Sequence, residues 1–150
     1  MTIEPRHPDH PDAAALVARY FAELSARLGG FDPQRDPRPA SEFTPPAGLF
    51  LVLYDDDGRA LACGGLKRLA LGTMEIKQMF VVPEARGRGL GRKILATLEE
   101  AARAMRADRV LLDTAAPLNE AQRLYEASGY RRIPPYNTNP YAAAWFEKGL

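Results

Sequence analysis

The segment Arg86–Arg92, which reads Arg-Gly-Arg-Gly-Leu-Gly-Arg, constrains the fold more than any other part of the chain. It follows an apolar, strand-like run closed by Pro83, and it precedes a strong helical pattern. A glycine-rich turn that enters a helix gathers unpaired backbone N–H groups, and the helix dipole favours an anion there. Glycine also removes the Cβ atoms that would block the anion. The sequence therefore predicts a turn that binds an anion, with pyrophosphate as the expected group.

Two common phosphate motifs do not fit this segment. A P-loop needs Gly, four residues, Gly, Lys and then Ser or Thr, and the chain has no such string. A dinucleotide fingerprint needs Gly-x-Gly-x-x-Gly, whereas Gly87, Gly89 and Gly91 recur at every second position. What the chain does contain is Arg-x-x-Gly-x-Gly, formed by Arg86, Gly89 and Gly91.

This pattern resembles the coenzyme A motif of the GNAT superfamily of acetyl-CoA-dependent N-acetyltransferases. A second segment, residues 119–130, is similar to the superfamily's Asn-x-x-Ala-x-x-x-Tyr-x-x-x-Gly-Phe, with Tyr130 in place of Phe. The two motifs stand in the family's order, separated by one helix and one strand. The resemblance covers roughly the second half of the chain.

Hydrophobic periodicity and turn residues predict the elements in between. We expect helices at 12–28, 90–105 and 119–128, and strands at 49–54, 60–69, 74–82, 109–113 and around 145–146. Their order predicts one domain over residues 1–150, an α/β sandwich with a central mixed sheet flanked by helices. The resemblance implies that strands 74–82 and 109–113 splay into a V around the pantetheine arm. Uninterrupted alternation along 74–82 would place Glu75, Lys77 and Val81 on one face.

The resemblance also implies a coenzyme A site, carried over residue by residue. The pyrophosphate would be wrapped by Gly87, Arg88, Gly89, Leu90, Gly91 and Arg92, with added positive charge from Arg86. Backbone groups of Met79, Phe80 and Val81 would bond the pantetheine amides. Asn119 would bond the pantetheine arm, although an asparagine at this position equally fits a plain helix N-cap.

Acetyl transfer to an amine needs a base and an acid. An alkylamine with a pKa of about 10.4 must lose a proton, and the leaving thiolate must gain one. The resemblance implies that Tyr125 lies near the sulfur as the general acid; the alternative is an aromatic side chain that only packs on the sheet. Glu75 is the best candidate for the base, acting through water; the alternative is a solvent-facing carboxylate paired with Lys77. Glu42 and Asp113 are weaker candidates.

Composition excludes several other classes. A net charge of +1 gives no general electrostatic reason to bind nucleic acid or an anionic membrane. The single cysteine, Cys63, excludes an internal disulfide and is expected to be a buried structural residue. His7 and His10 lie in a proline-rich turn, so we predict no metal site. No signal peptide or membrane span is expected, which favours a cytoplasmic location.

The loop 134–141, together with residues 31–43 and the first helix, is expected to line the acceptor opening. This loop has no Asp or Glu, so its Tyr and Asn residues and the nearby arginines favour a small polar acceptor, including one that carries a carboxylate. We predict an acetyl-CoA-dependent N-acetyltransferase that acts on a primary amine of a small molecule by direct attack in a ternary complex. The alternative is a non-catalytic acyl-CoA-binding sensor. The sequence leaves the acceptor's identity and a homodimer open.

Overall fold

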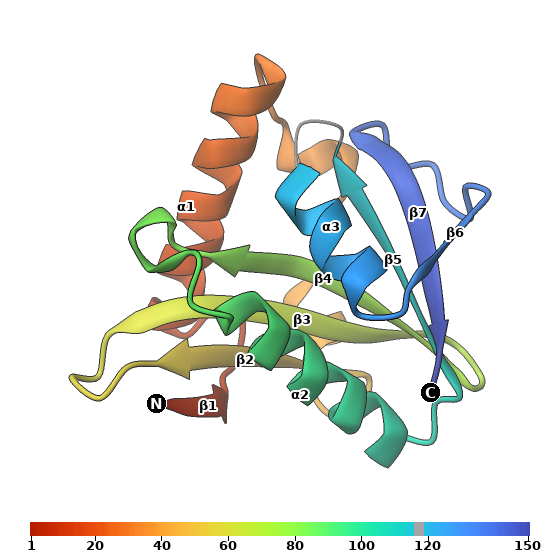
Figure 1. Cartoon of the computed structure of the whole chain (residues 1–150), viewed down its shortest axis with the longest axis horizontal. Coiled ribbons are helices and arrows are strands. Elements are labelled where there is room, and N and C mark those ends of the chain that lie inside the picture. Colours follow the sequence, from red (N-terminus) through yellow and green to blue (C-terminus); the bar gives the residue numbers. More distant parts are fainter. Residues whose placement is uncertain (116–118) are drawn as a thin grey trace.

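The computed structural model describes residues 1–115 and 119–150. The helices are α1 (Pro11–Leu28), α2 (Leu90–Ala104) and α3 (Asn119–Ala127), with short 3₁₀ turns η1 (Pro33–Arg35), η2 (Ala40–Phe43) and η3 (Pro83–Ala85). The strands are β1 (Thr2–Pro5), β2 (Gly48–Tyr54), β3 (Ala60–Ala70), β4 (Thr73–Val81), β5 (Arg109–Ala115), β6 (Arg131–Ile133) and β7 (Ala142–Gly149). The predicted α/β class is confirmed (Figure 1).

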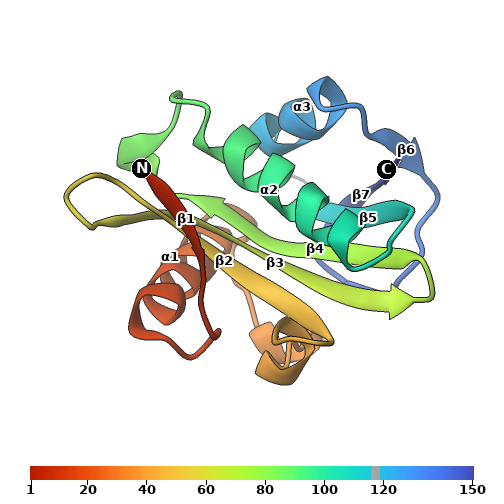
Figure 2. The same cartoon turned by 90° about the horizontal axis from the view of Figure 1, so that it is seen from below.

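The seven strands form one mixed sheet in the order β1-β2-β3-β4-β5-β7-β6. Every neighbouring pair is antiparallel except β4 and β5, which are parallel. Helices α2 and α3 cover one face, and α1 with the segment that carries η1 and η2 covers the other (Figure 2). The mixed, helix-flanked sheet that the sequence predicted is therefore present.

The long helices begin and end at residues whose chemistry explains the boundary. Pro11 opens α1, where a missing N–H costs nothing, and the His10 side chain accepts a hydrogen bond from the next free N–H, that of Asp12. Gly29, with φ +71°, ends α1 in the left-handed region. In α2 the buried stripe includes Leu90, Ile94 and Leu98, and this apolar face packs on the sheet.

Strands β4 and β5 pair over a short length only. Thr73–Glu75 of β4 pairs with Arg109–Leu111 of β5, and no further partners follow although both strands continue. Beyond this point the two strands point in different directions (Figure 1). The edge of β4 from Ile76 to Val81 thus has no strand partner on the β5 side. This confirms the predicted V.

A bulge interrupts β4 inside the V. Lys77 pairs with Gly65 and Phe80 pairs with Cys63, so two residues of β4, Gln78 and Met79, stand opposite one residue of β3. Gln78 takes φ +58°, which is rare for a residue with a side chain.

The bulge reverses the alternation of faces that follows it. Lys77 bonds Asp113 and Asp36 on the α1 side, while Val81 lies close to Gly91 at the start of α2. Phe80 packs against Tyr20 of α1. The expectation that Glu75, Lys77 and Val81 share one face was therefore wrong, because it assumed an unbroken strand.

Candidate active site

The glycine-rich turn has an open geometry in front of α2. Gly87 and Gly89 take φ +79° and +75°, and a Cβ at either position would meet no atom within 4 Å. No side chain caps α2, and the N–H groups from Gly87 to Arg92 find no acceptor in the described part of the chain. Free donors at the positive end of a helix dipole suit an anion. The predicted turn geometry is present, whereas phosphate binding itself stays a prediction.

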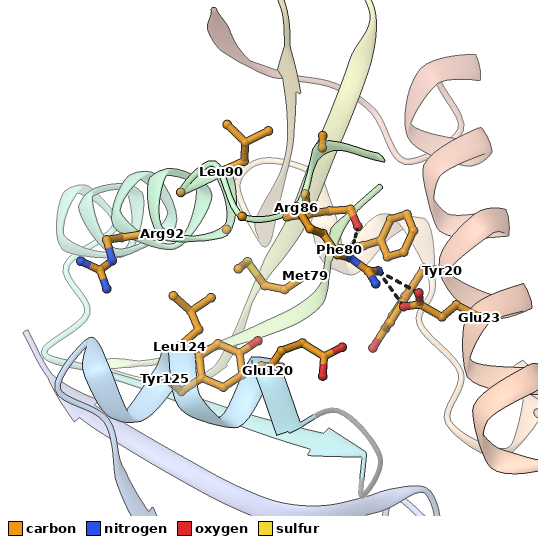
Figure 3. Close-up of a pocket in the computed structure, with 16 residues that line it drawn as sticks. Tyr20, Glu23, Met79, Phe80, Arg86, Leu90, Arg92, Glu120, Leu124 and Tyr125 are labelled. Atoms are coloured by element: carbon orange, nitrogen blue, oxygen red, sulfur yellow. Dashed lines mark hydrogen bonds and ion pairs between the residues drawn. The ribbon is translucent and has the colours of Figure 1, made fainter. Parts of the chain in front are cut away.

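The turn opens into a cleft of about 440 Å³, which β4, α1, α2 and α3 enclose (Figure 3). Of the predicted cofactor residues, its walls include Met79, Phe80, Val81, Arg86, Gly87, Gly89, Leu90, Gly91 and Arg92. Arg88 and Asn119 are exposed and do not line it; Asn119 is the first residue of α3. The sequence did not predict the other wall residues besides Tyr125, which are Tyr20, Glu23, Ala85, Glu120, Ala121 and Leu124.

Arg86 is engaged with the protein. Its guanidinium donates to both carboxylate oxygens of Glu23, at 2.8 and 2.9 Å, and its Nε donates to the carbonyl of Val81 at 3.0 Å (Figure 3). Arg86 therefore ties α1 to the glycine turn and does not present a free charge. Exposed Arg92 on the cleft wall and exposed Arg88 beside it have no ion pair with any described residue, and these two are the arginines available to a phosphate.

Tyr125 projects from α3 into the cleft. Its side chain is 5% exposed, its ring packs against Tyr130 and Phe146, and its hydroxyl points toward the middle of the cleft (Figure 3). No described residue accepts from or donates to this hydroxyl. Burial raises the pKa of Tyr125 well above that of a free phenol. The side chain is therefore a neutral donor that faces a space where a ligand would sit.

Glu75 lies in a second hollow of about 420 Å³, on the α1 side of the sheet. Its side chain is 3% exposed, and Tyr136 donates its hydroxyl to Oε2 at 2.5 Å. Lys77 Nζ lies 3.7 Å from the same oxygen. Burial raises the pKa of Glu75, and Lys77 and the Tyr136 hydroxyl offset part of that increase. We call this space the acceptor hollow.

A charge network organises the acceptor hollow. Lys77 Nζ lies 3.0 Å from Asp113, 3.5 Å from Asp36 and 3.7 Å from Glu75, so it contacts three carboxylates. Asp113 also accepts hydrogen bonds from the side chains of Asn137 and Asn139, which holds the loop 134–141 over the sheet. Asp113 is thus saturated with donors and is a poor candidate for a base.

A cavity of about 30 Å³ lies between the cleft and the acceptor hollow. Tyr20 and Tyr125 line both this cavity and the cleft, and Arg38 and Lys77 line both this cavity and the acceptor hollow. The two predicted catalytic residues, Tyr125 and Glu75, therefore lie in different spaces, and the small cavity shares wall residues with both. The sequence missed Arg38, Lys77 and Tyr20, because these residues come together only through the fold.

No group of three or more His, Cys, Asp or Glu side chains in residues 1–115 and 119–150 is arranged to hold a metal ion. None of the helices in the same residues is both long and apolar enough to cross a bilayer.

The family model for the acetyltransferase (GNAT) family matches residues 16–130. The chain belongs to this family. An uncharacterized N-acetyltransferase of Schizosaccharomyces pombe is 32% identical over 135 residues, which cover 88% of this chain and 82% of that protein. A Klebsiella pneumoniae structure assigned as an acyl-CoA N-acyltransferase has a TM-score of 0.78 and 28% identity, with coverage of 99% of this chain and 97% of that chain.

A more distant neighbour contains the cofactor. N-acetylglutamate synthase from Neisseria gonorrhoeae, solved with coenzyme A and N-acetylglutamate, has a TM-score of 0.72 and 18% identity. It aligns with 100% of this chain and 35% of its own length, which shows a shared fold. The family match, the Schizosaccharomyces pombe relative and the Klebsiella pneumoniae structure confirm the enzyme prediction: the chain is an N-acetyltransferase that uses an acyl-CoA donor.

Proposed function

We propose that this N-acetyltransferase transfers an acetyl group from acetyl-CoA to a primary amine of a small molecule, by direct attack in a ternary complex. One observation carries the proposal: the free N–H groups of the glycine turn and the free hydroxyl of Tyr125 face the same cleft. The turn can bind a pyrophosphate and the hydroxyl can donate to a sulfur. The edge of β4 that has no strand partner lies between them.

The wall of the cleft fits coenzyme A on physical grounds. The segment Gly87–Arg92 offers backbone donors, and Arg88 and Arg92 add unpaired positive charge for the pyrophosphate. Backbone groups of Met79–Val81, on the edge that β5 leaves free, can pair with amide groups of an extended pantetheine arm. Asn119 remains a proposed contact to that arm, carried over from the family motif.

In the transfer, the amine nitrogen bonds to the acetyl carbon, the carbon–sulfur bond breaks, and one proton passes from nitrogen to sulfur overall. Tyr125 donates a proton to the departing sulfur. Glu75 receives the amine proton, through water because it lies in the acceptor hollow and not in the cleft. The raised pKa of Glu75 makes it a stronger base than an exposed glutamate, which suits this role.

Direct transfer is favoured because the cysteine cannot act as a nucleophile. Cys63 is the sole cysteine of the sequence and is fully buried. Burial raises the pKa of its thiol to about 12, and its Sγ donates to the carbonyl of Gln78 at 3.4 Å. A thiol in this state has almost no thiolate at neutral pH.

The test is initial-rate kinetics with thiol-release detection, after a screen of small primary amines has found an acceptor. Varying both substrates should give intersecting double-reciprocal lines, as a ternary complex requires, and mass spectrometry should show an acetylated acceptor. Parallel lines together with a trapped acetyl-enzyme would overturn direct transfer. Tight acetyl-CoA binding without any acetylated amine would overturn the proposed activity.

A further inference from the structure

Arg38 is a buried cation with unused hydrogen-bonding capacity. It lies between η1 and η2, and its side chain is 10% exposed. Its Nη2 donates to Asp36 at 2.9 Å, the Tyr20 hydroxyl lies beside the guanidinium, and Nε and Nη1 are buried without a geometrically sound hydrogen bond among the described residues. A buried guanidinium that leaves donors unpaired is costly, so such a group needs an explanation.

The unused donors match a carboxylate. Nη2 carries two protons, one beside Nε and one beside Nη1, and Asp36 takes one of them through a single oxygen. The other Nη2 proton and its neighbour therefore leave one fork open. Two parallel N–H groups of this kind bind both oxygens of a carboxylate.

The other cations that line the acceptor hollow are engaged with the protein: Lys67 pairs with Glu42, and Arg109 bonds Thr73 and Glu147. Lys77 contacts Asp36, Glu75 and Asp113 and is saturated by them. Asp36, the partner of Arg38, is shared with Lys77. The guanidinium of Arg38 is thus the cation of this network with donors to spare.

The position of Arg38 limits the length of the ligand. Arg38 lines the acceptor hollow and also the 30 Å³ cavity that Tyr125 reaches. That volume is about the space of one water molecule. A carboxylate on Arg38 and an amine at the thioester are therefore separated by a short spacer, and any further part of the molecule must extend into the acceptor hollow.

We infer that the acceptor is a small α-amino acid whose carboxylate binds the open fork of Arg38 and whose amino group faces the cleft. This inference rests on the proposed function and names its substrate class. The amino nitrogen takes the acetyl group, the thiol of coenzyme A leaves, and the product is an N-acetylamino acid. The side chain of the amino acid lies in the acceptor hollow.

The experiment compares the twenty common L-amino acids with their C-terminal amides, which keep the amine and remove the carboxylate charge. Thiol release and product mass are measured with acetyl-CoA. We expect at least one amino acid to be acetylated, with kcat/KM about 10²-fold or more above that of its amide, because the amide leaves the buried guanidinium without its anion.

Variants assign this preference to Arg38. Arg38→Met should lower kcat/KM for the amino acid by about 10²-fold, chiefly through KM, and should leave the amide nearly unaffected. Arg38→Lys keeps the charge but not the two parallel N–H groups. It should lower the ratio of kcat/KM for the amino acid to that for its amide by about tenfold or more. The matched control is Arg131→Met, which removes a 77% exposed arginine and should preserve the discrimination. The rise in Tm caused by acetyl-CoA reports an intact donor site in each variant.

The outcomes separate the two levels of the proposal. If amides or other carboxylate-free amines are acetylated as well as the acids, the amino-acid inference is wrong and the N-acetyltransferase proposal stands. If Arg38→Met and Arg38→Lys both keep the full discrimination, Arg38 does not bind the carboxylate and the inference is again wrong. If the folded protein binds acetyl-CoA but acetylates no amine in any set, both fail.

Discussion

Removing the hydroxyl of Tyr125 should separate catalysis from stability. The hydroxyl has no partner in residues 1–115 and 119–150, and the ring contacts with Tyr130 and Phe146 survive in Tyr125→Phe. The free energy of unfolding should therefore change by no more than about 0.5 kcal/mol. Loss of the proton donor to sulfur should lower kcat by about 10²-fold. At about 1.36 kcal/mol per tenfold change, this is about 2.7 kcal/mol of transition-state stabilisation.

Tyr130 provides the matched control. Its hydroxyl donates to Glu99 Oε2 at 2.7 Å, and both side chains are buried. Tyr130→Phe removes a hydrogen bond to a charged group, which costs about 1.5–3 kcal/mol. For a chain of this length that cost lowers Tm by about 5–10 °C. The hydroxyl faces away from the cleft, so kcat should stay within about twofold of the wild-type value.

Thermal melts and initial rates of thiol release, measured on both variants, distinguish a catalytic role of the Tyr125 hydroxyl from a structural one. The expected pattern is a stable Tyr125→Phe with a kcat about 10²-fold low and a less stable Tyr130→Phe with nearly wild-type kcat. If Tyr125→Phe melts as early as Tyr130→Phe, the Tyr125 hydroxyl has a structural role and is not free. If Tyr125→Phe keeps its full kcat, the hydroxyl does not donate to the sulfur.

Two further predictions concern the donor turn and the base. Gly89→Glu and its control Gly58→Glu start from nearly the same φ, +75° and +77°, with open space at both, so each should lose about 1–2 kcal/mol of stability. Only Gly89→Glu should abolish the stabilisation by acetyl-CoA, about 2.7 kcal/mol at 100 times Kd; an equal loss in both would refute the assigned site. Burial raises the pKa of Glu75, so its protonated form contributes to the free energy of unfolding. This contribution is fully present below the unfolded pKa of about 4.3, and it is lost as the pH rises through the folded pKa. Glu75→Gln should therefore raise Tm at pH 8 but not at pH 4. Its kcat should be about 10²-fold below the wild-type value at pH 7 and should recover toward pH 9.5. A kcat that does not recover with pH would exclude Glu75 as the base.

The donor half of the site could be predicted from sequence because it is local. The turn 86–92, the strand before it and the helix after it are contiguous, and glycine spacing alone determines the open backbone geometry. Tyr125 could be predicted from a second contiguous motif, residues 119–130. Arg86 departs from the expectation because its partner Glu23 lies 63 positions away on α1, and Arg88 and Asn119 lie outside the walls of the cleft.

The acceptor half could not be predicted in the same way. Its polar side chains come from four separate segments: Arg38 from the loop before β2, Lys77 from β4, Asp113 from β5 and Tyr136 from the loop before β7. The loop 134–141 has no acidic residue, which led us to expect an opening without acidic lining. The fold instead brings Asp36, Glu75 and Asp113 beside that loop.

The bulge explains how two spaces on opposite sides of one strand can serve one reaction. Before Gln78, the side chains of Glu75 and Lys77 face the acceptor hollow. After it, the alternation has shifted, and Val81 faces the start of α2 beside the glycine turn. Since β5 has already separated from β4 at this point, the backbone between the two faces is open on one edge. A donor that runs along this edge and an acceptor held by Arg38 would therefore meet at the bulge, beside the small cavity that Tyr125 and Lys77 line.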